Sequence, residues 1–164
     1  MSGLNFRLFY NILIAKIWRL TQEELNLEKI HKLISEALKA RKKAYVPYSG
    51  FGVGAAILTH DKEIYSGFNI ENAAYPVCNC AERTALFRAV FDGYRKFSAI
   101  AVVGGMTRED SLDSYCPPCG MCRQALREFC VPDEFEIILA KSINDFKIFT
   151  LEDLLPQSFG PNNL

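Results

Sequence analysis

Two short stretches of the sequence carry thiols and a carboxylate at spacings that suit metal chemistry. One places Cys80 two residues before Glu82, and the other is the C-x-x-C pair Cys119 and Cys122. Each stretch falls at the predicted start of a helix, where free N–H groups and the helix dipole favour negative charge and lower a thiol pKa. Zinc binds deprotonated thiols, and three of them leave one tetrahedral position open for water. The spacing therefore predicts a catalytic zinc site.

Glu82 and Arg83 are the groups expected to act on that site. A carboxylate two residues from a ligand should point into the same pocket and exchange protons with water there. Three thiolates on one zinc ion leave a net negative charge, which two helix N-termini offset in part. A hydrogen bond from Arg83 to thiolate sulfur would offset more. The alternative for Arg83 is an ordinary salt bridge, and spacing alone does not separate the two.

The cysteine distribution bears on whether the site is closed. The chain has six cysteines, at positions 78, 80, 116, 119, 122 and 130. Clustering beside a C-x-x-C pair favours metal or redox chemistry in a reducing compartment over a disulfide framework. Cys78 and Cys116 are each close enough in sequence to act as a fourth ligand. A closed four-cysteine structural site is thus the alternative to an open catalytic one.

Length and composition indicate one folded domain with a small-molecule partner. The chain has 164 residues, of which 49% are hydrophobic and 23% charged, and its 19 basic residues balance its 19 acidic ones. That length and apolar content suffice for one buried core. Nucleic-acid binding would need a basic excess or stripe, which is absent from this composition. We therefore expect neither a nucleic-acid partner nor a membrane partner.

Residues 1–26 read as an extension outside the domain. Leu8–Ile17 is mostly apolar but is interrupted by Asn11 and Lys16, and it is too short to span a membrane. Basic residues without an acid before Glu23 give a weak organelle-targeting signal. An added helix, or an upstream start site read into the protein, is the preferred interpretation, and the role of the segment stays unknown.

The rest of the chain, residues 27–164, reads as a single α/β domain. Hydrophobic periodicity predicts helices at 27–44, 80–91 and 119–129 and a helical turn at 150–155. It predicts strands at 51–58, 63–69, 97–103, 135–140 and 146–149. Strands that alternate with helices predict a mostly parallel sheet covered on both faces.

Five motifs in order resemble the cytidine deaminase family, specifically its small homotetrameric type with three cysteine ligands. They are AYVPYSGFGVGAA (44–56), FNIENAAYP (68–76), CAERTA (80–85), PCGMCRQ (118–124) and LLPQSFGP (154–161). The resemblance runs from residue 27 to residue 164. It implies a three-layer α/β/α sandwich with a five-stranded mixed sheet.

The resemblance also implies a role for each matched position. One Zn²⁺ per chain would bind Cys80, Cys119 and Cys122, with Glu82 as the proton shuttle. Arg83 would moderate the thiolate charge. The implied substrate contacts are Phe51 on the pyrimidine ring, Asn69 and Glu71 on the ribose, and the Ala81 backbone on the base edge. Asn72 is a further implied substrate contact. Ala73 and Tyr75 would reach the ribose of a neighbouring subunit's substrate, and Phe159 would cover a neighbour's pocket.

The implied activity is hydrolytic deamination of cytidine and deoxycytidine in cytoplasmic pyrimidine salvage, by a homotetramer with shared active sites. A deaminase of the same fold for a free base or a nucleoside antibiotic is one alternative, against which the Asn69 and Glu71 pair favours a ribose. A thiol–disulfide oxidoreductase is another, but it leaves Cys80 and Glu82 unused. A third is a zinc-stabilised binding module, which a closed metal site would support.

Overall fold

The computed structural model describes residues 27–109 and 111–164, so the predicted extension at residues 1–26 lies outside the described residues. The chain is helical from residue 27 to residue 41. The elements that follow are β1 (Phe51–Thr59), β2 (Ile64–Phe68), η1 (Tyr75–Val77), α2 (Ala81–Phe91), β3 (Phe97–Met106), α3 (Gly120–Arg127), β4 (Glu136–Ser142), β5 (Asp145–Thr150), α4 (Leu151–Leu154) and η2 (Pro161–Asn163).

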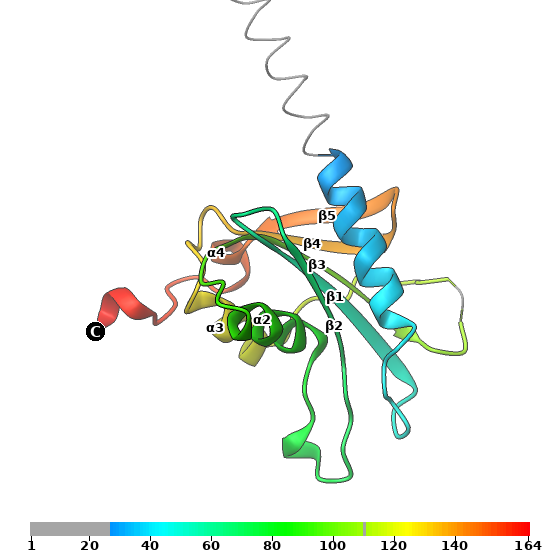
Figure 1. Cartoon of the computed structure of the whole chain (residues 1–164). Coiled ribbons are helices and arrows are strands. Elements are labelled where there is room, and N and C mark those ends of the chain that lie inside the picture. The colour runs from blue at the N-terminus through cyan, green and yellow to red at the C-terminus, as the bar shows by residue number, and fades with distance from the viewer. Residues whose placement is uncertain (1–26, 110) are drawn as a thin grey trace, which may run out of the picture.

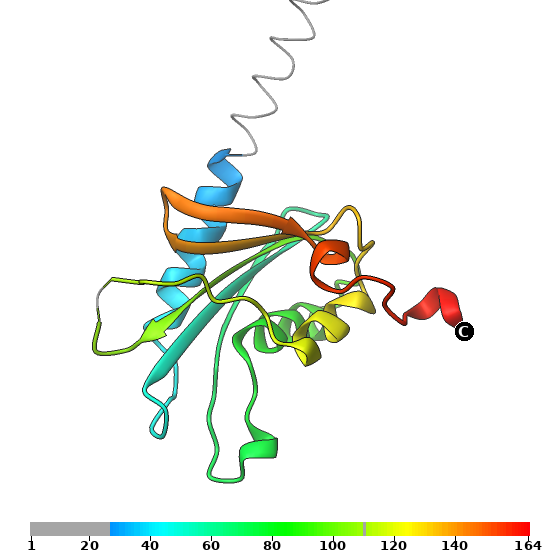
Figure 2. The ribbon, with the colours of Figure 1, turned by 180° about the vertical axis from the view of Figure 1, so that it is seen from behind.

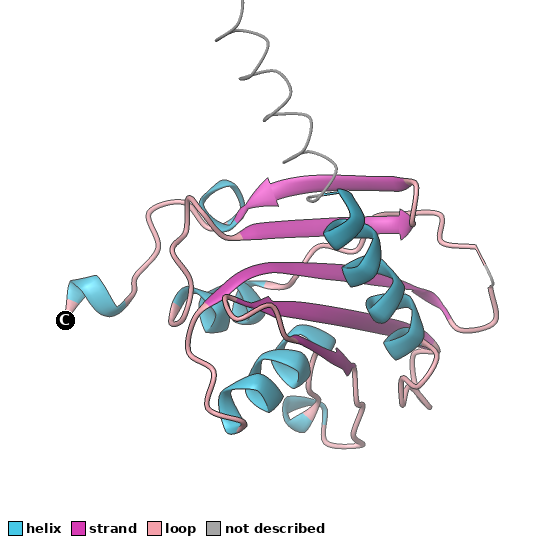
Figure 3. Ribbon diagram, turned by 45° about the horizontal axis from the view of Figure 1, so that its top comes forward, coloured by secondary structure: helices cyan, strands magenta, loops and turns pink. Residues whose placement is uncertain are grey.

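The five strands form one mixed sheet in the order β2-β1-β3-β4-β5 (Figure 3). β1 is antiparallel to both β2 and β3, β3 is parallel to β4, and β4 is antiparallel to β5. The mixed sheet is confirmed, whereas the prediction of a mostly parallel sheet is wrong. The short turns after β1 and β4 can join only antiparallel neighbours, and a parallel pair needs a longer crossover, which here contains α3.

Helices cover both faces of the sheet, as the implied three-layer sandwich requires. The helix at residues 27–41 lies on one face, and α2 and α3 lie on the other (Figures 1 and 2). Alternate residues of β3 serve the two cores: Ile100 and Val102 are buried with α2 and α3, while Ala99 and Ala101 are buried with the helix at 27–41. This alternation is the period-two pattern of a strand buried on both faces.

A glycine in β2 allows α2 to lie directly on the sheet. A Cβ atom added at Gly67 would come within 2.4 Å of the Ala85 nitrogen and 2.5 Å of the Ala81 oxygen. Real Cβ atoms do not approach backbone this closely, so a side chain at this position would displace the first turn of α2. That turn follows Cys80 and contains Glu82, so Gly67 helps to set where the thiol and the carboxylate lie.

The predicted elements are confirmed with shifted boundaries. The first helix ends at residue 41 rather than 44. β3 continues past the predicted end at Val103 to Met106, because the Gly104–Gly105 pair stays in register with β1 through the pair Phe51 and Met106. Within the described residues, the helices are too short or too polar to cross a membrane.

Candidate active site

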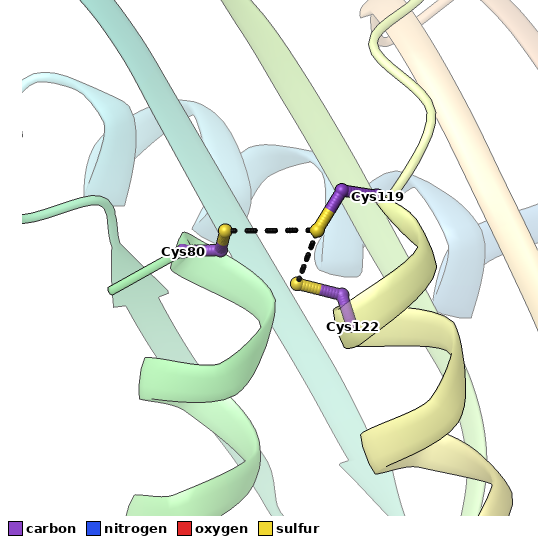
Figure 4. Close-up of side chains that lie close together, drawn as sticks. All are labelled: Cys80, Cys119 and Cys122. Carbon is purple, nitrogen blue, oxygen red and sulfur yellow. Dashed lines mark hydrogen bonds between the residues drawn. The ribbon is translucent and has the colours of Figure 1, made fainter. Parts of the chain in front are cut away.

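Three thiols from two helices meet at one end of the fold (Figure 4). Cys80 is the N-cap residue of α2, Cys119 is the N-cap residue of α3, and Cys122 lies in the first turn of α3. The Sγ atoms of Cys80 and Cys119 are 3.9 Å apart, and those of Cys119 and Cys122 are 3.6 Å apart. Neither N-cap side chain hydrogen-bonds its own helix, so both thiols are free to face the cluster.

The spacing of the three sulfur atoms fits a zinc ion. Zinc–sulfur bonds of about 2.3 Å in tetrahedral geometry place two sulfur atoms about 3.8 Å apart. The measured separations of 3.6 Å and 3.9 Å lie on either side of that value. Across residues 27–109 and 111–164, no other group of three or more potential ligands comes this close together.

Cys78 and Cys116 do not join the cluster. The Cys78 sulfur accepts a hydrogen bond from the Asn72 backbone N–H at 3.2 Å. Cys116 lies against Gly104, and burial raises the pKa of its thiol to about 11. Among the described residues, the group of mutually close potential ligands therefore contains three thiols and neither Cys78 nor Cys116, which does not support the closed four-cysteine alternative.

The surroundings of Cys80 stabilise a thiolate. Hydrogen bonds from the Cys122 thiol, from Arg83 and from the Cys119 thiol lower the pKa of Cys80 to about 5. The Arg83 Nη2 atom lies 3.7 Å from the Cys80 sulfur and 3.4 Å from the Cys78 carbonyl oxygen. Within the described residues Arg83 forms no salt bridge with an acid, and its Nε atom is buried without a partner. Its charge is thus directed at sulfur.

Glu82 is one of two buried polar residues among those described, and its exposed fraction is 5%. Burial raises the pKa of its carboxyl group, and the negative charge of Cys80 raises it further. A raised pKa brings the neutral and charged forms closer in free energy near neutral pH, which suits a group that must both accept and donate a proton.

A cavity of about 590 Å³ opens beside the cluster. Cys80, Cys119 and Glu82 all line it. Four of the predicted substrate-contact residues also line it, namely Asn69, Glu71, Tyr75 and Ala81. The volume lies in the range of small-molecule sites, and the lining combines apolar walls with a few polar groups.

Glu71 and Asn69 are held in place by backbone groups. The Glu71 Oε2 atom accepts hydrogen bonds from the N–H groups of Tyr48 at 2.9 Å and Ser49 at 3.3 Å. Hydrogen bonding, above all from the Ser49 side chain, lowers the pKa of Glu71. The Asn69 side chain accepts from Val53 N–H at 2.8 Å and donates to the Phe51 oxygen at 2.9 Å. Each side chain keeps hydrogen-bonding capacity for a ligand.

The other four predicted substrate-contact residues do not line this cavity. The half-buried Phe51 ring lies against Gly104. Asn72 is exposed and accepts a hydrogen bond from Ala74 N–H at 2.9 Å, and Ala73 is exposed beside it. Phe159 is 60% exposed, on the C-terminal segment that projects from the fold (Figure 1). A single copy of the chain therefore does not bring these four residues together with the thiols.

Sequence reasoning missed several residues that line the cavity. They are Tyr48, Ser49, Val53, Ile70, Asn79 and Pro117, whereas Cys78 and Cys116, which also line it, were named only as candidate metal ligands. Two signals were available for part of this set. Val53 follows Phe51 by two residues in a strand, and Asn79 directly precedes the first ligand. The remaining residues reach the cavity through loops whose path local patterns do not specify.

Comparisons with known proteins agree on one family. Residues 27–135 match the model of the cytidine and deoxycytidylate deaminase zinc-binding region. The chain is 47% identical over 135 residues to a cytidine deaminase of Sporosarcina psychrophila, which covers 82% of this chain and 94% of that protein. A probable cytidine deaminase of Dictyostelium discoideum is 37% identical over 140 residues, 85% of this chain and 90% of that protein.

Solved structures give the same result. The crystal structure of cytidine deaminase from Burkholderia pseudomallei superposes with a TM-score of 0.70 at 47% identity, over 79% of this chain and 98% of that one. Sequence, fold and the arrangement of the three thiols therefore lead to the same conclusion, which is that the chain belongs to the cytidine deaminase family.

Proposed function

We propose that the chain catalyses the zinc-dependent hydrolytic deamination of cytidine and deoxycytidine to uridine and deoxyuridine, in pyrimidine salvage. One observation carries the proposal: three thiols lie within 4.8 Å of one another, and two of them, Cys80 and Cys119, line a cavity together with the buried carboxyl group of Glu82. A redox role for the C-x-x-C pair would leave Cys80, 3.9 Å from Cys119, and Glu82 without a purpose.

The three thiols would hold one zinc ion, and Glu82 would move the protons. When bound, zinc supplies Lewis acidity that makes water nucleophilic near neutral pH. Glu82 accepts a proton from that water and donates it to ring N3, while the water oxygen forms a bond to C4. Glu82 then transfers the remaining proton of that oxygen to the amino group, the C4–N bond breaks and ammonia leaves. Arg83 lowers the cost of gathering three thiolates.

The nucleoside would be oriented by groups on the cavity wall. Asn69 and Glu71 would hydrogen-bond the ribose, and their fixed positions support this because little side-chain entropy remains to be lost on binding. The Ala81 backbone would contact the base edge. Phe51 would lie against the pyrimidine ring, which would require its ring to approach the cavity more closely than it does in a single copy.

The site would be completed by neighbouring copies in a homotetramer. Asn72, Ala73, Tyr75 and Phe159 are all exposed in the single chain. Tyr75 is 71% exposed and Phe159 is 60% exposed, which is costly for large aromatic side chains unless another surface covers them. We propose that these side chains reach, or cover, the pocket of an adjacent subunit.

The catalytic unit would be residues 27–164, with residues 1–26 as an extension of separate role. The family match starts at residue 27, which supports this division. Three thiolate ligands need reducing conditions, which supports a cytoplasmic location.

The direct test is an absorbance assay on purified protein with cytidine, deoxycytidine, cytosine and adenosine, combined with metal analysis. We expect about one zinc per chain, turnover of both cytosine nucleosides, and loss of turnover after chelation that returns with added zinc. Equal turnover of free cytosine would contradict the ribose contacts. Full activity in metal-free protein would contradict the proposed chemistry.

A further inference from the structure

The loop between β3 and α3, residues 107–119, brings Cys119 to the cluster and also contributes Cys116 and Pro117 to the cavity wall. Its residues 112–115 pass from the core on one face of the sheet to the core on the other. Leu112 is buried in the core beneath the helix at residues 27–41, whereas Tyr115, three residues later, lies on the core that contains α2 and α3.

Tyr115 is held by three charged side chains of the β4–β5 hairpin. Its hydroxyl group donates a hydrogen bond to the Asp145 carboxylate. The Nζ atoms of Lys141 and Lys147 lie 5.1 Å and 4.7 Å from the centre of its ring, and Lys141 also forms an ion pair with Asp145 at 2.7 Å. The Tyr115 side chain is restrained in position and orientation, because its hydroxyl group is hydrogen-bonded to a carboxylate and two ammonium groups lie near its ring.

Little freedom remains between Tyr115 and the zinc ligand. Only three residues separate Tyr115 from Cys119, and two of them are the prolines Pro117 and Pro118, which restrict the backbone. Cys116 rests on bare backbone, since a Cβ at Gly104 would lie 2.7 Å from its sulfur. The buried Pro118 accepts a hydrogen bond at its carbonyl oxygen from Arg123 Nε at 2.7 Å. Tyr115 and Cys119 are therefore joined by a short segment with little backbone freedom.

The loop affects the distance between the thiol at the start of α2 and the thiols at the start of α3. Cys119 and Cys122 lie three residues apart at the start of one helix, so their separation is set locally. Cys80 belongs to α2, and its distance to Cys119 depends on how the two helix N-termini are brought together. We propose that Tyr115 is a positioning residue for the metal site, and that its contacts with Asp145, Lys141 and Lys147 fix Cys119 opposite Cys80. This rests on the proposed function, because it assigns what the thiol cluster binds.

The chain offers a matched control for the test. Tyr65 also donates its hydroxyl group to an aspartate, Asp92, at 2.8 Å, and it packs on the same core. Asp92 lies at the C-terminal end of α2, the end away from Cys80. Substitutions at Tyr65 therefore remove a comparable tyrosine–aspartate contact without touching the loop that leads to Cys119.

The experiment measures how fast zinc leaves the loaded enzyme for a chromogenic chelator, in Tyr115→Phe, Tyr115→Leu, Tyr65→Phe and Tyr65→Leu. We expect release roughly tenfold faster in Tyr115→Leu, and an intermediate rate in Tyr115→Phe, which keeps the ring between the lysines but loses one hydrogen bond to a charged group. Both leucine variants should have a lower melting temperature than wild type when all three proteins are metal-free. Both Tyr65 variants should release zinc at the wild-type rate.

Two results would overturn the proposal: zinc release from Tyr115→Leu within about twofold of wild type, or equal acceleration by Tyr65→Leu, which would mean a general loss of stability. A wild-type protein that holds no zinc would refute the proposed function itself, and the measurement separates that outcome from the other two. As a second readout, zinc-saturated Tyr115→Leu should recover most of its kcat, because Tyr115 touches neither substrate nor Glu82.

Discussion

Glu82 is the residue proposed to move protons, and two effects shift the pKa of its carboxyl group upward. Burial removes water that would solvate the carboxylate, and the Cys80 thiolate repels it. The same thiolate is stabilised by Arg83 at 3.7 Å. The N-cap and the first turn of α2 thus place a carboxyl group of raised pKa two residues from a thiol of lowered pKa, a combination that suits the proposed hydrolytic chemistry.

Replacing the carboxylate with an amide should separate chemistry from metal binding. Glu82→Gln should lower kcat by roughly 10²–10⁴-fold, the usual contribution of a general acid–base. Zinc content should be unchanged, since all three sulfur ligands remain. Initial rates and metal analysis on the same sample test this, with Glu128→Gln as the control because Glu128 is an exposed residue at the C-terminal end of α3 and does not line the cavity. Near-normal turnover would remove Glu82 from the proton-transfer role.

The raised pKa of Glu82 also predicts how the stability of metal-free protein depends on pH. An acid whose pKa is higher in the folded protein than in the unfolded chain binds protons more tightly in the folded state. Its contribution to the free energy of unfolding is therefore fully present below the unfolded-state pKa and is lost as pH rises through the folded-state pKa. After removal of zinc by a chelator, the free energy of unfolding of Glu82→Gln should therefore rise relative to that of metal-free wild type as pH increases above the ordinary pKa range of a glutamate. Chemical denaturation at several pH values measures this, and a constant difference would contradict it.

At the scale of elements, the site depends on two helix N-termini that meet at the same end of the sheet. α2 can approach because Gly67 has no side chain, and the loop that leads to α3 lies on the glycine pair at the end of β3. The dipoles of both helices then point their positive ends at the thiols. These close approaches are properties of packing, and they are sensitive to a single methyl group.

Adding that methyl group should disturb both stability and metal binding. Gly67→Ala would place Cβ 2.4 Å from the Ala85 nitrogen, so α2 must move away from β2. We expect a loss of about 1–3 kcal/mol or more in unfolding free energy, together with weaker zinc retention. Gly120→Ala is the control, because its added Cβ meets nothing within 4 Å. Equal melting temperatures for Gly67→Ala and wild type would show that the helix does not rest on the strand as described.

At the scale of the whole molecule, the single chain contains the thiol cluster and the cavity beside it, while several aromatic side chains remain exposed. Tyr75 lines the cavity yet is 71% exposed, and Phe159 is 60% exposed on a segment that extends outward. The backbone oxygen of Phe159 accepts from Gln124 Nε2 at 3.0 Å, so this segment is tied to α3, the helix that carries Cys122. We therefore expect assembly and catalysis to be linked.

Complementation between two defective variants tests the shared site. Phe159→Ala should lower kcat/KM by roughly tenfold or more, the effect of losing one well-buried aromatic contact. Co-expressed with Glu82→Gln, it should regain activity, since a Glu82→Gln subunit can supply Phe159 to a neighbour that retains its acid. Sedimentation velocity confirms the assembly state of each sample. Activity equal to the sum of the two separate variants would argue against a site built from two chains.

Much of the site could be predicted from the sequence, because the residues proposed to carry the chemistry lie only two or three positions apart within each motif. Cys119 and Cys122 lie one helical turn apart, and Glu82 follows Cys80 by two residues, so local geometry nearly determines how each pair is arranged. The strands and helices were likewise predicted from periodicity, with errors of a few residues at their ends. Periodicity predicted a mostly parallel sheet, which is wrong, whereas the resemblance to the family predicted the mixed sheet. The direction of a strand pair depends on which segments meet and not on the pattern within each one.

The distance between the α2 thiol and the α3 thiols, and the contacts that hold them at that distance, depend on the tertiary structure. The 3.9 Å between Cys80 and Cys119 joins residues far apart in the chain, and Tyr115 meets Asp145 across a similar gap in sequence. No local propensity encodes such contacts, because they depend on the packing of whole elements against the sheet. The short spacings in the chain thus indicate which atoms are able to bind a metal and to move a proton. Whether those atoms come together depends on the fold, because only long-range packing can bring the N-termini of two helices close enough for their thiols to be in contact.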